Sequence, residues 1–153
     1  MNNISNKYCE EKATSLEAET EVSVRFCEVD SMGIVWHGSY VKYFEDGREA
    51  FGKKYGIGYL DIFGNGFYAP LVDLNFKFKK PLIYGKKAIV KTRYINSDAA
   101  KLIFEYEIVS AEDGSIIATG SSTQVFLNKS YELILSCPDF YLDWKKKNGL
   151  IVE

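Results

Sequence analysis

The chain has 153 residues, of which 46% are apolar and 26% charged, and its formal net charge is -2. This length suits one domain with its own core, and the composition excludes a disordered, collagen-like or disulfide-stapled chain. The acidic balance argues against a general nucleic-acid-binding protein, and no apolar run reaches the about 20 residues of a membrane span. The three cysteines are far apart and odd in number, which favours a reducing, cytoplasmic location.

The N-terminal part of the chain divides into a polar stretch and a first strand. Residues 1–20 are rich in glutamate and show no apolar period, so we predict a flexible polar tail before a single domain over residues 21–153. Apolar and polar residues alternate over residues 22–26, which predicts a half-buried strand. A turn-rich segment, residues 28–33, follows, and then the only histidine, His37.

A helix is predicted from residue 39 to residue 55, because aromatic and small residues recur there at spacings of three and four. These residues are Tyr40, Phe44, Gly47, Phe51 and Tyr55. Glycine at position 47 costs about 1 kcal/mol of helix propensity relative to alanine. Because Gly47 lies on the apolar face, we expect another backbone to approach closely there. Gly56 and Gly58 then end the helix.

Alternating patterns return after residue 68 and predict a series of strands joined by short turns. The predicted strands cover residues 68–78, 87–94, 101–108 and 115–127. Their short connectors favour an antiparallel meander. One long helix packed on one face of such a sheet gives an α+β domain. The lysine-rich end of the chain, residues 144–147, is either a terminal helix or a tail.

Two polar side chains near the start of the predicted helix could carry chemistry. Asp30 lies in the turn-rich segment, and His37 follows it by seven residues. Such an aspartate is either a turn former, whose carboxylate accepts local backbone N–H groups, or a catalytic carboxylate on a rigid scaffold. The helix start offers N–H groups without internal partners and a partial positive charge. A carboxylate beside a carbonyl held by such amides has the components of acyl transfer.

A second feature is the concentration of cations between Lys77 and Lys101, where Asp98 is the only acid. The stretch is either a solvated strand face that protects a sheet edge or a site for a polyanion such as a nucleotide phosphate. Its candidate phosphate ligands are Lys79, Lys80, Lys91 and Arg93. No glycine-rich phosphate loop and no zinc ligand set accompanies them, so we predict neither a dinucleotide-binding fold nor a metal site.

A longer motif surrounds the two candidate residues. Residues 24–40 read VRFCEVDSMGIVWHGSY, and an aromatic-rich helix with a glutamate and an arginine continues them. The segment resembles the signature of the 4-hydroxybenzoyl-CoA thioesterase-like family, a strand followed by D-x-x-G-x-V-x-[HYF]-x-x-Y and such a helix. The rest of the chain, through Leu127, agrees with this family in the order and length of its elements.

The resemblance implies a hotdog fold, in which a curved antiparallel sheet wraps one long central helix. It also implies a homo-oligomer, either a dimer that joins two sheets edge to edge or a tetramer, with active sites at the subunit interface. Asp30 takes the place of the family's nucleophile or general base, and the backbone N–H of His37 that of an oxyanion donor. Glu45 and Arg48 are expected to form a structural pair on the helix. The motif positions expected to bind substrate are Gly33, Val35, Trp36 and Tyr40.

Together these inferences predict an acyl-CoA thioesterase, which converts acyl-CoA and water into a carboxylic acid and free CoA. The reaction needs a carboxylate, oxyanion donors and a dry acyl pocket, and it needs no cofactor because CoA is part of the substrate. The four candidate phosphate ligands are expected to bind CoA. The alternatives are an acyl-carrier-protein thioesterase, which recognises an acidic protein partner, and an acyl-CoA-binding module without turnover. A hotdog dehydratase fits the motif around Asp30 less well.

Overall fold

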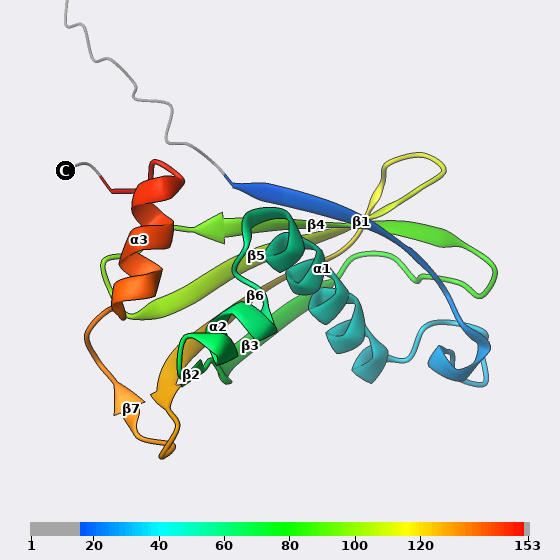
Figure 1. Ribbon diagram of the computed structural model, residues 1–153. Helices are drawn as coiled ribbons and strands as arrows, with labels where there is room; N and C mark the ends of the chain where they lie inside the picture. The colour runs from blue at the N-terminus through cyan, green and yellow to red at the C-terminus, as the bar shows by residue number, and fades with distance from the viewer. Residues whose placement is uncertain (1–15, 152–153) are drawn as a thin grey trace, which may run out of the picture.

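A computed structural model describes residues 16–151, and Figure 1 shows the order of the elements. The strands are β1 (Glu17–Ser23), β2 (Phe67–Tyr68), β3 (Leu71–Phe78), β4 (Lys87–Ile95), β5 (Lys101–Ser110), β6 (Ile116–Asn128) and β7 (Leu133–Ile134). The helices are α1 (Tyr40–Tyr55), α2 (Tyr59–Gly64) and α3 (Asp139–Lys147), with the 3₁₀ turns η1 (Phe26–Glu28) and η2 (His37–Ser39).

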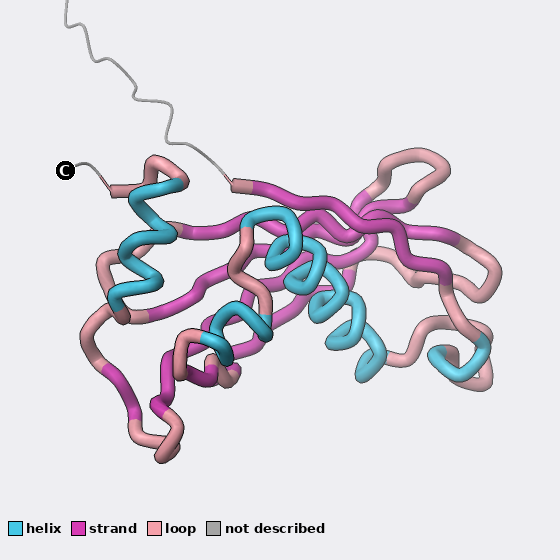
Figure 2. The backbone as a smooth tube through the Cα atoms, viewed as in Figure 1, coloured by secondary structure: helices cyan, strands magenta, loops and turns pink. Residues whose placement is uncertain are grey.

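The strands form one antiparallel sheet in which the long strands have the order β1-β4-β5-β6-β3. The predicted meander is confirmed for β4, β5 and β6, which pair in sequence order. β3 precedes them in the chain but pairs with the other side of β6, so β1 and β3 are the two edges. The helices lie on one side of the sheet, with α1 across its middle (Figure 2), and the predicted α+β class is confirmed.

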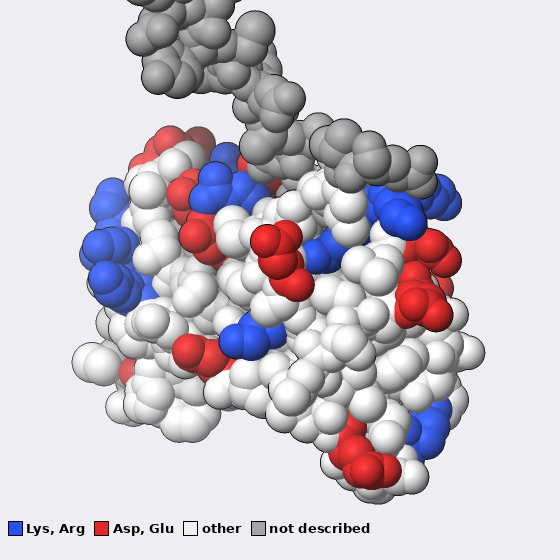
Figure 3. Space-filling view, turned by 90° about the vertical axis from the view of Figure 1, so that its left-hand side faces the viewer, with Lys and Arg blue, Asp and Glu red and all other residues white. Residues whose placement is uncertain are grey.

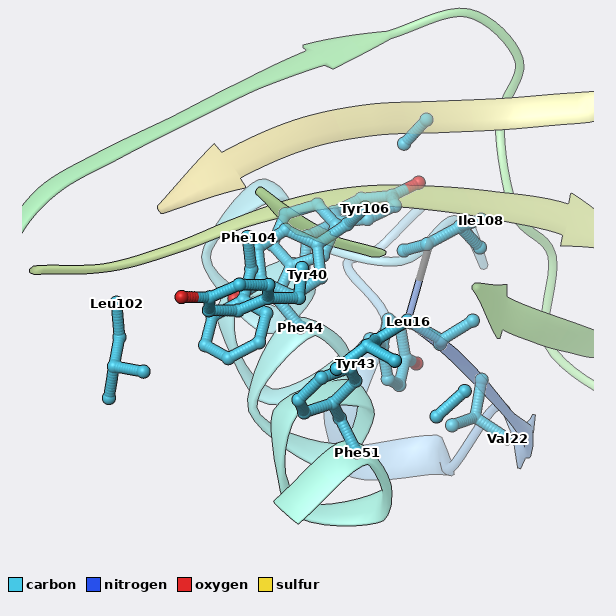
Figure 4. Close-up of a cluster of buried hydrophobic side chains, with 14 of the residues drawn as sticks. Leu16, Val22, Tyr40, Tyr43, Phe44, Phe51, Leu102, Phe104, Tyr106 and Ile108 are labelled. Carbon is cyan, nitrogen blue, oxygen red and sulfur yellow. The ribbon is translucent and has the colours of Figure 1, made fainter. Parts of the chain in front are cut away.

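The core lies between α1 and the sheet, and aromatic side chains from both sides fill it (Figure 4). Phe44 and Phe51 of α1 have no exposed surface. The Phe44 ring lies 4.7 Å from that of Tyr106, and the Phe51 ring 5.0 Å from that of Phe104. Burial of a side chain of this size contributes about 2 kcal/mol. The apolar face of α1 therefore fixes the helix, including its N-terminal end, against the sheet.

The predicted N-terminal tail extends too far along the chain. Residues 17–20 belong to β1, where Glu17 is paired with Arg93 of β4, and Leu16 and Ala18 are buried. The single domain therefore begins earlier than residue 21. The rest of the predicted tail, residues 1–15, lies outside the described residues.

Three further segments differ from the prediction or decide between its alternatives. The strand expected over residues 68–78 is broken at Pro70, which has no N–H for a ladder. The short helix α2 was not predicted; it begins after Gly58, whose N–H donates to the Asp61 carboxylate at 2.8 Å. The lysine-rich end forms α3, and the indole N–H of Trp144 donates to the carbonyl of Tyr55, at the end of α1, at 2.7 Å.

Gly47 packs against side chains rather than against the backbone that the sequence predicted. A Cβ atom at this position would lie 2.4 Å from Thr92 Oγ1 and 2.8 Å from Val90 Cγ1 of β4. Thr92 Oγ1 is itself buried and has no hydrogen-bond partner among the described residues. The absence of a side chain at Gly47 is what allows α1 to lie this close to the sheet.

Gly47→Ala is therefore expected to lower the free energy of unfolding by about 1–2 kcal/mol in chemical denaturation. Alanine favours the helix by about 1 kcal/mol, but forcing a methyl group into a packed core costs about 1–3 kcal/mol or more. Adding Thr92→Ala removes the nearest clashing oxygen, so the double variant should be more stable than the sum of the two single changes. Simple additivity of the two effects would contradict the contact.

Candidate active site

A tight loop between β1 and α1 carries Asp30. Val29 and Val35 form an isolated antiparallel bridge at its base, and the N–H of Asp30 donates to the carbonyl of Ile34 at 2.8 Å. At its tip Gly33 has a φ of +73°, a conformation that favours glycine, and donates to the carbonyl of Asp30 at 3.0 Å. The loop lies at the end of the molecule opposite α3 (Figure 1).

The carboxylate of Asp30 is held through one oxygen only. Oδ1 accepts the N–H groups of Met32 at 2.8 Å and Ile34 at 3.4 Å. Oδ2 accepts no hydrogen bond within residues 16–151. Asp30 is thus the turn former that the sequence allowed, and it keeps one oxygen available for chemistry as well.

Asp30 lines a pocket of about 330 Å³ between its loop, the start of α1 and the end of β3. Five of the nine predicted site residues besides Asp30 also line this pocket: His37, Val35, Tyr40, Lys79 and Lys80. The remaining walls are the apolar side chains of Ile34, Phe78 and Pro81. The structure therefore brings the predicted acid, the helix start and two lysines to one apolar-walled site.

The start of α1, where His37 and Tyr40 line this pocket, has backbone N–H groups without an internal partner. The turn η2 leads directly into the helix, and its first internal hydrogen bonds are donated by Ser39, to the carbonyl of Trp36 at 2.9 Å, and by Tyr40, to that of His37. The N–H groups of His37 and Gly38 come before these bonds and donate to no other segment among the described residues. A helix start of this kind carries a partial positive charge and can accept a developing oxyanion.

The ring of Trp36 lies against Gly38 at the helix start. A Cβ atom on Gly38 would lie 2.0 Å from Cζ3 of the Trp36 ring, and this ring also contacts that of His37 at 4.7 Å between centroids. Half of Trp36 is exposed to solvent, at 52%. Trp36, a predicted substrate contact, is not among the residues that line the pocket, and its ring occupies the space that a side chain at position 38 would need.

A second loop supports the Asp30 loop from the side. Val35 donates to the carbonyl of Leu82 at 2.8 Å, and Tyr84 donates to the carbonyl of Gly33 at 3.0 Å. The Tyr40 hydroxyl also meets the backbone of Leu82, and burial raises the pKa of this hydroxyl. Gly33, predicted as a substrate contact, is therefore at the supported tip of the loop rather than in the pocket wall.

The four candidate phosphate ligands divide into two pairs. Lys79 and Lys80 follow β3 and line the Asp30 pocket. Lys91 and Arg93 lie on the face of β4 turned away from α1, where Lys91 is 3.9 Å from Glu19 and Arg93 is ion-paired with Glu105. The structure therefore does not bring the second pair to the candidate active site of this chain.

Arg48 does not form the predicted pair with Glu45. Within residues 16–151 it makes no ion pair, and its guanidinium donates to the Tyr106 hydroxyl at 3.3 Å, which in turn bonds Ser122. Arg48 and Glu45 line a second, larger pocket of about 590 Å³, with apolar walls from α2 and β5. Neither this pocket nor α2 was predicted from the sequence; the signal for α2 was the apolar run after Gly58.

Comparison with known proteins places the chain in a family. The family model of the thioesterase-like superfamily matches residues 24–144. The chain belongs to the thioesterase-like superfamily. Membership supports hydrolase activity on thioesters, as the sequence predicted, and the similar solved structures confirm the predicted hotdog fold.

Individual thioesterase relatives are similar over most of the chain. A putative acyl-CoA thioesterase of Bacillus subtilis, YneP, is 36% identical over 132 residues, 84% of this chain and 96% of its own. The structure of a DHNA-CoA thioesterase from Staphylococcus aureus is 30% identical, with a TM-score of 0.74 over 90% of this chain and 97% of that one. The chloroplastic acyl-acyl carrier protein thioesterase ATL3 of Arabidopsis thaliana is 30% identical over 74% of this chain and 60% of its own.

Two other features are absent from the part of the chain that the structure describes. No group of three or more histidine, cysteine, aspartate or glutamate side chains gathers there in a position to hold a metal ion. No helix there is long and apolar enough to cross a membrane.

Proposed function

We propose that this thioesterase hydrolyses acyl-CoA to a carboxylic acid and free CoA. The observation that carries the proposal is the position of Asp30, whose Oδ2 is available in the same pocket as the helix start and two lysines. The similarity to YneP, a putative acyl-CoA thioesterase, and to the DHNA-CoA thioesterase of Staphylococcus aureus supports the same substrate class.

The pocket supports a reaction at the thioester carbonyl in either of two forms. As nucleophile, Asp30 attacks the carbonyl carbon, the C–S bond breaks, the CoA thiolate takes a proton from solvent, and water hydrolyses the resulting anhydride. As general base, Asp30 removes a proton from a water molecule that attacks the same carbon; the C–S bond then breaks, and the CoA thiolate takes up a proton. In both forms the carbonyl oxygen becomes negative, and the N–H groups of His37 and Gly38 stabilise it.

Lys79 and Lys80 are the proposed ligands of the CoA phosphates. Replacing both with alanine is expected to raise KM for acyl-CoA about 10-fold and to change kcat little, because two exposed charge contacts contribute about 1 kcal/mol or less each. The matched control is Lys91→Ala with Arg93→Ala, which removes two cations from the opposite face of the sheet. Equal rises in KM for the two double variants would contradict the assignment.

The edge strand β3 supports the proposed dimer. One side of β3 pairs with β6, and its other side has no strand partner among the described residues. Three of its apolar side chains are exposed, Leu71 at 37%, Val72 at 60% and Phe78 at 50%. Exposed apolar edges of this kind are normally covered, and a two-fold axis allows the β3 strands of two copies to pair antiparallel.

Such pairing would complete the active site. The Asp30 pocket includes Phe78 at the C-terminal end of β3, whereas the larger pocket includes Ala69, just before the N-terminal end of β3. In an antiparallel pair about a two-fold axis these two ends of β3 come together. The larger pocket of one subunit would then receive the acyl group whose thioester lies at Asp30 of the other. A tetramer and a cytoplasmic location stay predictions.

The test is a thiol-release assay on a panel of aromatic, short-chain and long-chain acyl-CoA substrates. The wild-type protein is expected to release free CoA from at least one class. If no thiol is released and calorimetry detects acyl-CoA binding, the protein is a binding module and the proposal of turnover is wrong.

An acyl carrier protein is the alternative source of the thioester. The similarity to the acyl-acyl carrier protein thioesterase ATL3 favours this candidate. The chemistry at Asp30 is the same, but an acidic protein surface takes the place of the CoA phosphates at Lys79 and Lys80. Free CoA should inhibit a CoA-dependent enzyme strongly and a carrier-protein-dependent enzyme weakly, so competition assays separate the two.

A further inference from the structure

Glu28 is a buried carboxylate that the proposed chemistry does not use. Only 6% of its surface is exposed. Its Oε1 accepts two hydrogen bonds, from the backbone N–H of Arg25 at 2.7 Å and from the hydroxyl of Tyr43 at 3.1 Å. A buried ionised carboxylate is costly unless such donors surround it, and an apolar residue of similar size would avoid that cost. Stability alone therefore does not explain a glutamate here.

Glu28 and Tyr43 belong to the two segments that carry the proposed reacting groups. Glu28 comes immediately before the Asp30 loop, and its carbonyl accepts the N–H of Trp36 at 2.9 Å, which closes the base of the loop. Tyr43 lies in the first turn of α1, next to the amides at the helix start, and only 2% of its surface is exposed. The hydrogen bond between the two side chains thus joins the acid-bearing loop directly to the oxyanion-binding end of the helix.

The Tyr43 hydroxyl is always the donor in this bond. Burial and the negative charge of Glu28 raise the pKa of the Tyr43 hydroxyl far above its ordinary value, so the hydroxyl keeps its proton. The acceptor is oriented by its second bond, from Arg25. Because both groups are buried, the bond is not replaced by a bond to bulk water and holds one geometry.

We infer that Glu28 and Tyr43 are positioning residues, which hold the Asp30 carboxylate in register with the amides of His37 and Gly38. The inference rests on the proposed thioesterase function. Neither side chain touches the pocket that Asp30 lines. Their contribution is geometric: a displacement of about 1 Å between a catalytic group and the reacting carbonyl can cost about 100-fold in rate.

Tyr43→Phe is the sharpest test, because it removes one hydroxyl from this bond and leaves the ring in the core. We expect kcat for acyl-CoA hydrolysis to fall about 10- to 100-fold with KM nearly unchanged, since substrate contacts remain. The matched control is Tyr94→Phe. Tyr94 is equally buried and its hydroxyl bonds that of Tyr141, near the α3 end of the molecule. The Tyr94→Phe variant loses the same kind of hydrogen bond and should keep the wild-type kcat.

Two substitutions at Glu28 separate geometry from charge. Glu28→Gln keeps an oxygen that accepts both hydrogen bonds, so its kcat should stay within a few-fold of the wild type. Glu28→Ala removes the acceptor, and its kcat should fall at least as much as that of Tyr43→Phe. If Glu28→Gln is as slow as Glu28→Ala, or if Tyr43→Phe is as fast as Tyr94→Phe, the positioning role is wrong.

Hydrogen exchange supplies a readout that does not depend on activity. Tyr43→Phe should speed amide exchange in the segment 29–37 relative to the wild type, and Tyr94→Phe should not. Unchanged exchange in this segment would overturn the inference even for a protein without turnover. A wild-type chain that releases no thiol would instead refute the proposed function, so the two failures are distinguishable.

Discussion

Asp30→Asn is expected to lower kcat for acyl-CoA hydrolysis by at least about 100-fold, which corresponds to about 3 kcal/mol of barrier. The amide oxygen of asparagine can still accept the N–H groups of Met32 and Ile34, so the loop keeps its shape. What is lost is the negative charge on the free oxygen, and with it both the nucleophile and the base. Thiol release under single-turnover and steady-state conditions measures the effect.

The matched control for this variant is Asp113→Asn. Asp113 lies in the turn between β5 and β6, and its Oδ1 accepts the N–H of Ser115 at 2.9 Å, as Asp30 does in its own loop. It is exposed and outside the Asp30 pocket. This variant should keep full turnover. Circular dichroism and size-exclusion chromatography should show that both variants keep the wild-type fold and oligomer. Unchanged turnover in Asp30→Asn would remove Asp30 from the mechanism.

The local pattern around Asp30 was sufficient to predict that Asp30, His37 and the helix start lie together, because these residues are close in sequence. The loop, the turn η2 and the start of α1 are consecutive, so their contacts follow from short-range geometry. The two phosphate-ligand pairs show where this reasoning stops. Lys91 and Arg93 alternate along β4 with the buried Val90 and Thr92, which places them on the outer face. The concentration of cations along the sequence could not distinguish Lys91 and Arg93 from Lys79, which lies beyond the end of β3.

The misplaced tail boundary has a related physical cause. The glutamates of β1 make residues 17–20 polar in composition, and the sequence gives no sign of their partners. In the fold they face the cations of β4: Glu21 is 3.4 Å from Lys87, and Glu19 is near Lys91. The acidic residues of β1 and the basic residues of β4 thus face each other across two paired strands. Cross-strand pairing over such a separation requires the sheet register, which the sequence alone did not provide.

The proposed sharing of the active site between two subunits leads to the second large effect, at Leu60 of α2. Leu60 is 76% exposed and lines the larger pocket, so Leu60→Asp should leave the fold of the subunit intact, and an acid in the first turn of a helix is favourable. In the completed dimer the new carboxylate would be buried against the acyl group. We expect kcat/KM to fall at least about 10-fold, because an unpaired buried charge costs several kcal/mol. Leu135→Asp is the control, since Leu135 is 82% exposed and lies outside this pocket.

Subunit complementation then decides whether the two pockets act in one site. In the proposed dimer, the Asp30→Asn homodimer should be nearly inactive and the Leu60→Asp homodimer should be strongly impaired. In a mixed dimer, one of the two sites combines the intact acid of one subunit with the intact larger pocket of the other. Random assembly of equal amounts should therefore restore about a quarter of the wild-type active sites. A second surface on which copies could associate lies at the end of the molecule opposite the Asp30 loop. Figure 3 shows that the lower half of this end is mostly uncharged. It contains Leu133 and Leu135, which are exposed at 55% and 82%. If copies associated there instead of through β3, the two pockets would stay apart, and the mixture would show no more activity than its components.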